Sequence, residues 1–199
     1  MREKMELKTK IIAGKFKGKM IEIPAINTTR SSKSILKESF FNTLQNEIMD
    51  KNFVEVFAGS GSIGLEALSR GAKECFFIEK NSIAFDTLKR NIQTLEVANQ
   101  THILLGNSFT KFDIVLDMLK KSATKTYFYF DPPFAIREGM DDIYEKSLNL
   151  IQKIDNSLCA MVIIEHMTSL ELPKEIGSVT LLKRKKFGKS TLSYYIPKA

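Results

Sequence analysis

Five short apolar runs recur along the chain between more polar segments. Apolar side chains fill almost every position of each run instead of alternating with polar ones. Strands of a parallel sheet are covered on both faces, so their sequences read as nearly continuous apolar runs. We therefore predict buried parallel strands at residues 53–57, 74–78, 102–105, 127–130 and 159–164.

Segments with helical periodicity lie between these runs. From Phe85 to Leu95, apolar side chains recur every three or four residues, which places them on one face of a helix. The same spacing predicts helices over residues 36–48, 112–119 and 143–154. Strands that alternate with helices form right-handed βαβ units. The pattern therefore predicts an α/β fold with a doubly wound, mostly parallel sheet.

Both ends of the chain depart from this rhythm. Residues 10–23 have two glycines between short β-type runs, which predicts a hairpin. Residues 178–196 predict two strands joined around Gly188, an antiparallel hairpin that closes a seven-stranded sheet. We divide the chain into a basic N-terminal β extension over residues 1–30 and an α/β domain over residues 31–199.

The composition excludes several classes of protein. The chain has 199 residues, 43% of them hydrophobic, and no run approaches the length of a transmembrane helix. Its charged first residues lack the apolar core of a signal peptide. The two cysteines form no C-x-x-C motif, and two histidines supply few metal ligands. These features favour a cytoplasmic protein without a disulfide, a membrane segment or a metal.

Charge is distributed in blocks along the chain. The net charge is +7 over residues 1–37, −5 over 38–170 and +5 over 171–199. Basic ends favour contact with nucleic acid over lysines that serve solubility alone. Three lysines alternate in a β-type segment and should project from one face. The candidate phosphate-binding residues are these three, Lys15, Lys17 and Lys19, together with Arg30, Lys185 and Lys186.

A glycine-rich loop follows the first of the five predicted strands. Residues 59–64 match G-x-G-x-x-G between a strand and a helix, and Glu79 ends the next strand, where a carboxylate can bind ribose hydroxyls. The pattern predicts a nicotinamide dinucleotide or S-adenosylmethionine. Glu55, close to the loop, would repel a pyrophosphate but could hold a methionine ammonium, directly or through water. This carboxylate favours S-adenosylmethionine.

Asp131, Pro132, Pro133 and Phe134 follow the most aromatic strand in the chain. Ligands bind at the carboxyl ends of parallel strands, and the prolines remove N–H donors from this turn. The Asp131 carboxylate and the Pro132 carbonyl therefore present two acceptors, which suit an exocyclic NH₂ group. Phe134 offers a face on which an unpaired base can stack. The motif predicts chemistry on the amino group of a nucleobase.

Together these segments resemble the RsmD family, which methylates N2 of a guanine in 16S ribosomal RNA. The resemblance covers nearly the whole chain and includes IIAGKFKGKMIEIP, ESFFNTL, VFAGSGSIGLEALSRGA, FIEKN, DPPF, Glu165-His166 and KKFGKSTLSYY. It implies a Rossmann-like methyltransferase domain over residues 31–199 that uses S-adenosylmethionine. It also implies a monomer whose partner is ribosomal RNA or the small-subunit ribosomal particle.

The resemblance also implies roles for individual residues. Asp131, Pro132 and Phe134 would hold the target base. The cofactor would be bound by Glu55, Phe57, Gly59, Ser60, Gly61, Glu79, Lys80, Asn107 and Ser108. The chain departs from the family pattern at Glu55, Asn107 and Ser31, where Asp, Asp and Pro are usual. The carbonyl of Asn107 can still accept a hydrogen bond from the adenine amino group, so cofactor binding would be weaker at most.

Three alternatives to guanine-N2 methylation stay open. DPPF is shared with adenine-N6 methyltransferases of DNA and RNA, which makes adenine-N6 methylation the runner-up. A non-catalytic RNA-binding module with a vestigial cofactor fold would explain the basic ends but leaves DPPF without a purpose. An N5-glutamine protein methyltransferase more often has Asn at the head of this motif. We interpret His166, Cys75 and Cys159 as structural residues.

Overall fold

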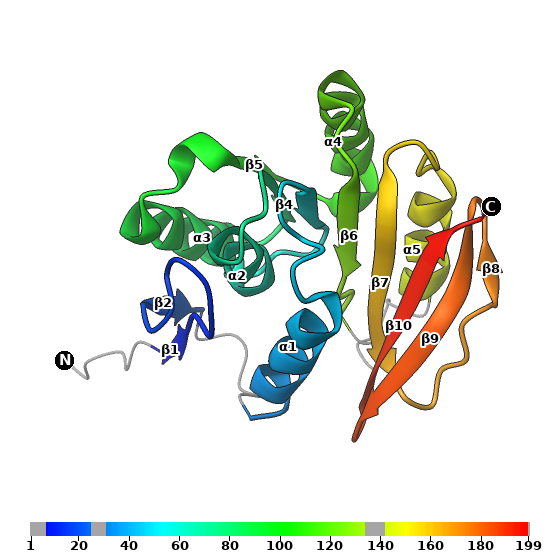
Figure 1. The fold of residues 1–199 in the computed structure, drawn as a ribbon, viewed down its shortest axis with the longest axis horizontal. Coiled ribbons are helices and arrows are strands. Elements are labelled where there is room, and N and C mark those ends of the chain that lie inside the picture. Colours follow the sequence, from blue (N-terminus) through cyan, green and yellow to red (C-terminus); the bar gives the residue numbers. More distant parts are fainter. Residues whose placement is uncertain (1–6, 25–30, 134–141, 199) are drawn as a thin grey trace.

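An eight-stranded sheet forms the centre of the protein, as the computed structural model shows for residues 7–24, 31–133 and 142–198 (Figure 1). The strand order is β5-β4-β3-β6-β7-β10-β9-β8. The first five strands in this order are parallel, and the last three join antiparallel. The strands are β3 (Asn52–Glu55), β4 (Cys75–Glu79), β5 (Thr101–Leu105), β6 (Thr126–Phe130), β7 (Cys159–Met167), β8 (Glu175–Ile176), β9 (Val179–Phe187) and β10 (Ser190–Pro197).

This topology confirms the predicted parallel sheet with a closing hairpin, but the predicted count of seven strands is wrong. The additional strand is β8, whose two residues pair with the start of β9. Two residues are too short to show a periodic pattern. The structure also ends β3 at Glu55, two residues before the predicted end, because the backbone turns there into the glycine-rich loop.

Helices cover both faces of the sheet. Helices α1 (Ser31–Leu44), α2 (Ser62–Ser69) and α3 (Ser82–Leu95) supply apolar side chains to the core on one face. Helices α4 (Ser108–Ser122) and α5 (Ile143–Gln152) do so on the other. A short 3₁₀ turn, η1 (Ala98–Gln100), precedes β5. Within the described ranges, no helix combines the length and the hydropathy that a membrane span requires.

The predicted helix over residues 36–48 stops early. Helix α1 ends at Leu44 because Gln45 has a left-handed backbone with φ of 47°. Ile48 lies in the turns that follow and is still fully buried. The spacing of Ile48 therefore predicts its burial correctly, but the prediction that Ile48 is helical is wrong.

The N-terminal hairpin packs on α2 and α3. Strands β1 (Leu7–Lys10) and β2 (Met20–Ile23) pair antiparallel, as predicted. The residues between them form successive turns instead of a strand, so the predicted alternation of Lys15, Lys17 and Lys19 on one strand face is wrong. The amide of Lys15 donates to the Ser69 carbonyl at 2.7 Å, which holds these turns against the end of α2.

Gly14 lets the hairpin approach α2 closely. Its φ is +82°, and a Cβ there would lie 1.8 Å from the carbonyl oxygen of Ser69. Gly18 has a similar φ of +87°, but a Cβ there would meet no atom within 4 Å. The two glycines share a backbone conformation and differ in their surroundings.

Replacing each glycine by Ala separates the two effects. Gly18→Ala is expected to lower the free energy of unfolding by about 1–2 kcal/mol, the cost of a left-handed alanine. Gly14→Ala adds a collision with backbone and should cost about 3 kcal/mol or more. Urea denaturation of both variants measures the difference, and equal losses would contradict this docking.

Candidate functional site

Four carboxylates lie at the carboxyl edge of four consecutive strands. In sheet order they are Glu79 on β4, Glu55 on β3, Asp131 after β6 and Glu165 on β7. In the strand register, Glu55 is opposite Phe77 and Tyr129, so Glu79 and Asp131 lie two residues further out. Glu55 is therefore buried, while Glu79 and Asp131 are partly exposed. The edge therefore offers a buried hydrogen-bond acceptor, Glu55, and two that are partly exposed, Glu79 and Asp131.

The glycine-rich loop runs from the end of β3 to the start of α2. Gly61 has a left-handed φ of 76° and donates its N–H to the Ala58 carbonyl at 2.8 Å. A Cβ at Gly61 would lie 2.4 Å from the Leu88 side chain. The carbonyl of the buried residue Ser60 accepts from Asn91 on α3 at 2.9 Å. Glycine is required here because the turn is both left-handed and tightly packed.

Glu79 holds the start of this loop through a hydrogen bond to its first glycine. One carboxylate oxygen accepts from the Gly59 amide at 2.6 Å, and the other accepts from the Asn81 amide at 2.7 Å. Each oxygen has more than one acceptor position, so two amide contacts leave capacity for ligand hydroxyl groups. Lys80, which follows Glu79, has an exposed side chain. The geometry suits the ribose-binding position predicted for Glu79.

Glu55 lies beneath the N-terminal turn of α2. Its Oε2 accepts from the Gly64 amide at 2.9 Å, and the residue is 4% exposed. Burial raises the pKa of Glu55 to about 8, against the opposing effect of the amides of Gly64 and Ile63. The negative charge of Asp131 raises it further. The charge of Lys37 lowers the pKa by less, so at neutral pH the carboxyl group of Glu55 holds a proton until a further cation binds beside it.

The loop after β5 joins the same edge. Asn107 caps α4, since its side-chain oxygen accepts from the Phe109 amide at 3.0 Å. The Ser108 hydroxyl donates to the Val56 carbonyl at 2.6 Å. The Phe57 ring lies 5.9 Å from that of Phe109, centroid to centroid. The predicted cofactor residues on these two loops are therefore held together by direct contacts.

The predicted base-binding residues are described in part. Asp131 is partly exposed and Pro132 is buried at the end of β6. Phe134 lies outside the described residues. His166 is 1% exposed, and its ring nitrogens contact the Met167 carbonyl at 2.9 Å and the Ser193 hydroxyl at 2.8 Å. These two contacts agree with a structural role for His166. Cys75 and Cys159 are both buried and not in a disulfide.

Glu165 lies at the same edge of the sheet, and sequence analysis gave it no role. It is 4% exposed, and one of its carboxylate oxygens accepts from the Tyr129 hydroxyl at 2.9 Å. The available signal was an acidic residue at the end of an apolar strand. The role of such an acidic residue depends on which strand lies next to it in the sheet, and the sequence does not specify the strand order.

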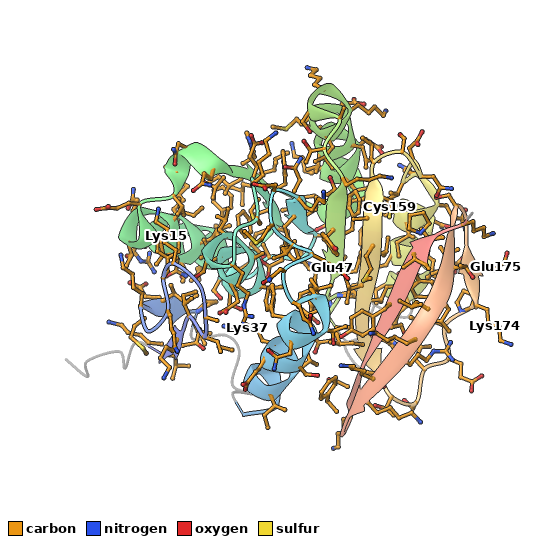
Figure 2. All side chains as sticks on the ribbon, viewed as in Figure 1. Lys15, Lys37, Glu47, Cys159, Lys174 and Glu175 are labelled. Atoms are coloured by element: carbon orange, nitrogen blue, oxygen red, sulfur yellow. The ribbon has the colours of Figure 1, made fainter. Side chains whose placement is uncertain are left out.

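The candidate phosphate-binding residues do not form one surface. The Nζ atoms of Lys15 and Lys19 lie 5.3 and 5.5 Å from the centre of the Phe16 ring, so these two lysines gather on the hairpin. Figure 2 shows Lys15 there and Lys37 between α1 and the hairpin. Lys17 is exposed on the same turns, and Arg30 lies outside the described residues.

Two further candidate phosphate-binding residues, Lys185 and Lys186, lie on β9 of the closing hairpin. Lys185 donates to the Thr43 hydroxyl on α1 at 2.6 Å. Lys186 is the next residue on β9 and is exposed, and side chains of successive strand residues point to opposite faces of a sheet. Lys185 and Lys186 therefore lie on opposite faces of the closing hairpin, and their contact with RNA stays a prediction. No group of three or more His, Cys, Asp or Glu suited to a metal ion occurs within the described part of the chain.

Comparison with known proteins gives a consistent result. The chain is 28% identical to ribosomal RNA small subunit methyltransferase D of Escherichia coli over 189 residues, 94% of this chain and 88% of that protein. The protein of the same name from Buchnera aphidicola is 31% identical over 180 residues, 88% of this chain and 86% of that protein. The solved structure of Escherichia coli yhhF has a TM-score of 0.77 at 27% identity and covers 97% of this chain and 99% of that chain.

These relatives confirm the predicted Rossmann-like methyltransferase fold with its closing hairpin. A family model described as conserved hypothetical protein 95 matches residues 9–196, almost the whole chain. The chain belongs to this family, the RsmD family of ribosomal RNA small subunit methyltransferase D.

Proposed function

We propose that this protein transfers a methyl group from S-adenosylmethionine to the N2 amino group of a guanine in small-subunit ribosomal RNA. Relatives named as ribosomal RNA methyltransferases support an enzyme that methylates ribosomal RNA. The observation that carries methylation of a nucleobase amino group is the position of Asp131 and Pro132, and guanine N2 is what the resemblance to the RsmD family implies. Asp131 and Pro132 follow β6, next to the strand that leads into the glycine-rich loop.

The residues at the edge fit S-adenosylmethionine. This cofactor has ribose hydroxyls to donate and a methionine ammonium, and it has no pyrophosphate. Glu79 offers acceptors to the hydroxyls, and Glu55 offers a buried carboxyl group to the ammonium. A nicotinamide dinucleotide would bring its pyrophosphate toward Glu55, at the N-terminus of α2. Phe57, Gly59, Ser60, Gly61, Lys80, Asn107 and Ser108 would complete the cofactor site.

The chemistry asks the protein chiefly for positioning. A bound sulfonium supplies a reactive methyl group, whereas the guanine amino nitrogen is a poor nucleophile because its lone pair is delocalised into the ring. The Asp131 carboxylate and the Pro132 carbonyl each accept one N–H of this amine. The lone pair then turns out of the ring plane, toward the cofactor side of the edge. Alignment of this kind contributes up to about 7–11 kcal/mol in ideal cases.

Asp131→Ala tests this role. The variant is expected to bind S-adenosylmethionine within a few fold of wild type and to lose about a hundredfold or more in kcat, because the contact strengthens in the transition state. Single-turnover transfer of labelled methyl to small-subunit ribosomal RNA measures the loss. Asp142→Ala, at an exposed carboxylate that pairs with Lys146, is the control. Near-normal turnover of Asp131→Ala would refute the assignment.

Proton release tests the role of Glu55. Its pKa of about 8 keeps it protonated at pH 7, and an ammonium beside it favours the ionised form. Binding of S-adenosylhomocysteine at pH 7 is therefore expected to release up to one proton. Calorimetry in two buffers of different ionisation enthalpy measures the release. Glu55→Gln should release none, and equal release from both proteins would exclude the contact.

The same residue gives a check that needs no cofactor. The folded-state pKa of Glu55 lies above its ordinary value of 4.5, so the folded protein binds this proton more tightly than the unfolded chain does. Its contribution to stability is therefore complete below about pH 4.5 and is lost as the pH rises toward 8. Glu55→Gln should flatten this part of the stability profile in urea denaturation.

The N-terminal hairpin is proposed to bind RNA phosphates through Lys15, Lys17 and Lys19, with Arg30, Lys185 and Lys186 as further contacts. Lys15 and Lys19 converge on one ring, so they present two positive charges on one surface. Contacts to phosphates release counterions, which makes RNA affinity fall steeply with salt.

Replacing Lys15 and Lys19 together by Ala should flatten the logarithmic salt dependence of RNA affinity by about 1.4–1.8 units. Filter binding across a series of salt concentrations gives the slope. Lys120 and Lys121, at the C-terminal end of α4, form the control pair. Identical slopes for the wild type and the Lys15 and Lys19 variant would show that the hairpin lysines serve solubility alone.

A further inference from the structure

Glu165 lies beside Asp131 at the carboxyl edge. Strands β6 and β7 are neighbours, and the last residues paired between them are Phe130 and Ile164. The next residue on each strand is a carboxylate, Asp131 on one and Glu165 on the other. Side chains alternate along a strand, so Glu165 shares with Tyr129 the face of the sheet that α1 covers.

The charges of this pair of carboxylates act on two buried phenols, Tyr129 and Tyr144. The Tyr129 hydroxyl donates to Glu165 at 2.9 Å and so orients its carboxylate. Burial, followed by the charges of Glu165 and Asp131, raises the pKa of Tyr129 well above its ordinary value. Burial and the charges of the same two carboxylates also raise the pKa of Tyr144, to about 12. Tyr129 therefore contacts Glu165 directly, and the charges of both carboxylates act on Tyr144 at the start of α5.

Tyr144 points to a ligand at this position. The residue is 8% exposed, and the backbone N–H of Met167 lies close enough to its hydroxyl oxygen to lower the pKa, but the hydroxyl proton has no acceptor among the described residues. A buried hydroxyl without a partner costs free energy, so such groups are rare unless a ligand or water satisfies them. A polar molecule next to Asp131 and Glu165 would do so.

A second carboxylate at this point selects for a second N–H donor. Guanine carries N1–H directly beside its 2-amino group, so this edge of the base offers adjacent donors. Adenine has an unprotonated N1 beside its 6-amino group. The lone pair of this N1 would face the Glu165 carboxylate and be repelled by it. Asp131 and Pro132 satisfy either amino group equally well, but Glu165 favours guanine alone.

We infer that Glu165 accepts a hydrogen bond from N1–H of the target guanine and thereby selects guanine over adenine. The inference rests on the proposed function, since it places the base with its amino group at Asp131. Tyr129 acts as a positioning residue, because it holds the Glu165 carboxylate through its hydroxyl. The choice of base then lies outside the DPPF motif, on the neighbouring strand.

The test compares guanine with 2,6-diaminopurine, which keeps the 2-amino group and has an unprotonated N1. The methylated guanine is first located with wild-type protein. Small-subunit ribosomal RNA is then rebuilt by ligation with either base at that position. Wild type is expected to prefer guanine by about a hundredfold or more in kcat/KM, because a site built for an N–H rejects the analogue without it.

Glu165→Gln should reduce this preference by about tenfold or more, since a glutamine can turn its amide to donate to a bare N1. Its affinity for S-adenosylhomocysteine should stay within a few fold of wild type, which shows that the variant is folded. Tyr129→Phe should weaken the preference less, with Glu165 present but unanchored. Glu47→Gln is the control, because exposed Glu47 also contacts a tyrosine hydroxyl, that of Tyr127 at 3.5 Å.

Each outcome decides one question. If wild type makes no N2-methylguanine in this RNA, the proposed function fails. If wild type makes it and Glu165→Gln keeps the full preference for guanine, the role of Glu165 is wrong and the proposed function stands. If Glu165→Gln does not bind S-adenosylhomocysteine, Tyr129→Phe decides, and an unchanged preference in that variant overturns the inference. An equal change in Glu47→Gln would also overturn it.

Discussion

A fully buried carboxylate on α2, Glu66, joins the segments on which the site depends. It accepts from the amides of Ile12 and Ala13 at 2.8 and 3.0 Å and from Arg70 at 2.9 Å, and Lys37 on α1 lies 3.5 Å away. A buried carboxylate is tolerated when donors surround it and its charge is balanced. Glu66 therefore links the N-terminal hairpin, α1 and α2, and α2 carries the end of the glycine-rich loop.

The position of α2 sets the depth of the site. Glu55 reaches the Gly64 amide in the first turns of α2, and Glu79 reaches the Gly59 amide at the start of the loop. Two carboxylates on neighbouring strands thus hold the loop at both ends. The two residues differ in burial: Glu55 is buried and holds a proton at neutral pH, whereas Glu79 lies partly exposed at the edge of the sheet. An acidic edge next to basic termini suits a cationic cofactor together with an anionic polymer.

Much of the fold could be predicted because its signals are local. Apolar runs predict the five parallel strands, and helical spacing from Phe85 to Leu95 predicts α3 (Ser82–Leu95). The predicted burial is wrong for β5, because this strand lies at the edge of the sheet and its side chains are only partly covered, with Leu105 49% exposed. The other wrong predictions concern residues whose backbone conformation does not follow from the local pattern of apolar and polar positions. Ile48 is buried without being helical, β8 is too short to show a period, and Lys15 and Lys17 lie in turns. Burial pattern reports which side chains face the core, and it reports backbone conformation less directly.

Local patterns in the sequence suffice to locate the elements and the residue types at their ends: the glycine-rich loop, Glu79 and the Asp131-Pro132 turn. Which of these groups lie next to one another follows from the packing of the strands in the sheet. The tertiary structure placed Glu165 beside Asp131, raised the pKa of Glu55 to about 8 by burial, and turned Lys185 toward α1. The physical reason is that pKa, specificity and surface charge depend on neighbours from other strands. Strand order, which no local pattern encodes, supplies those neighbours.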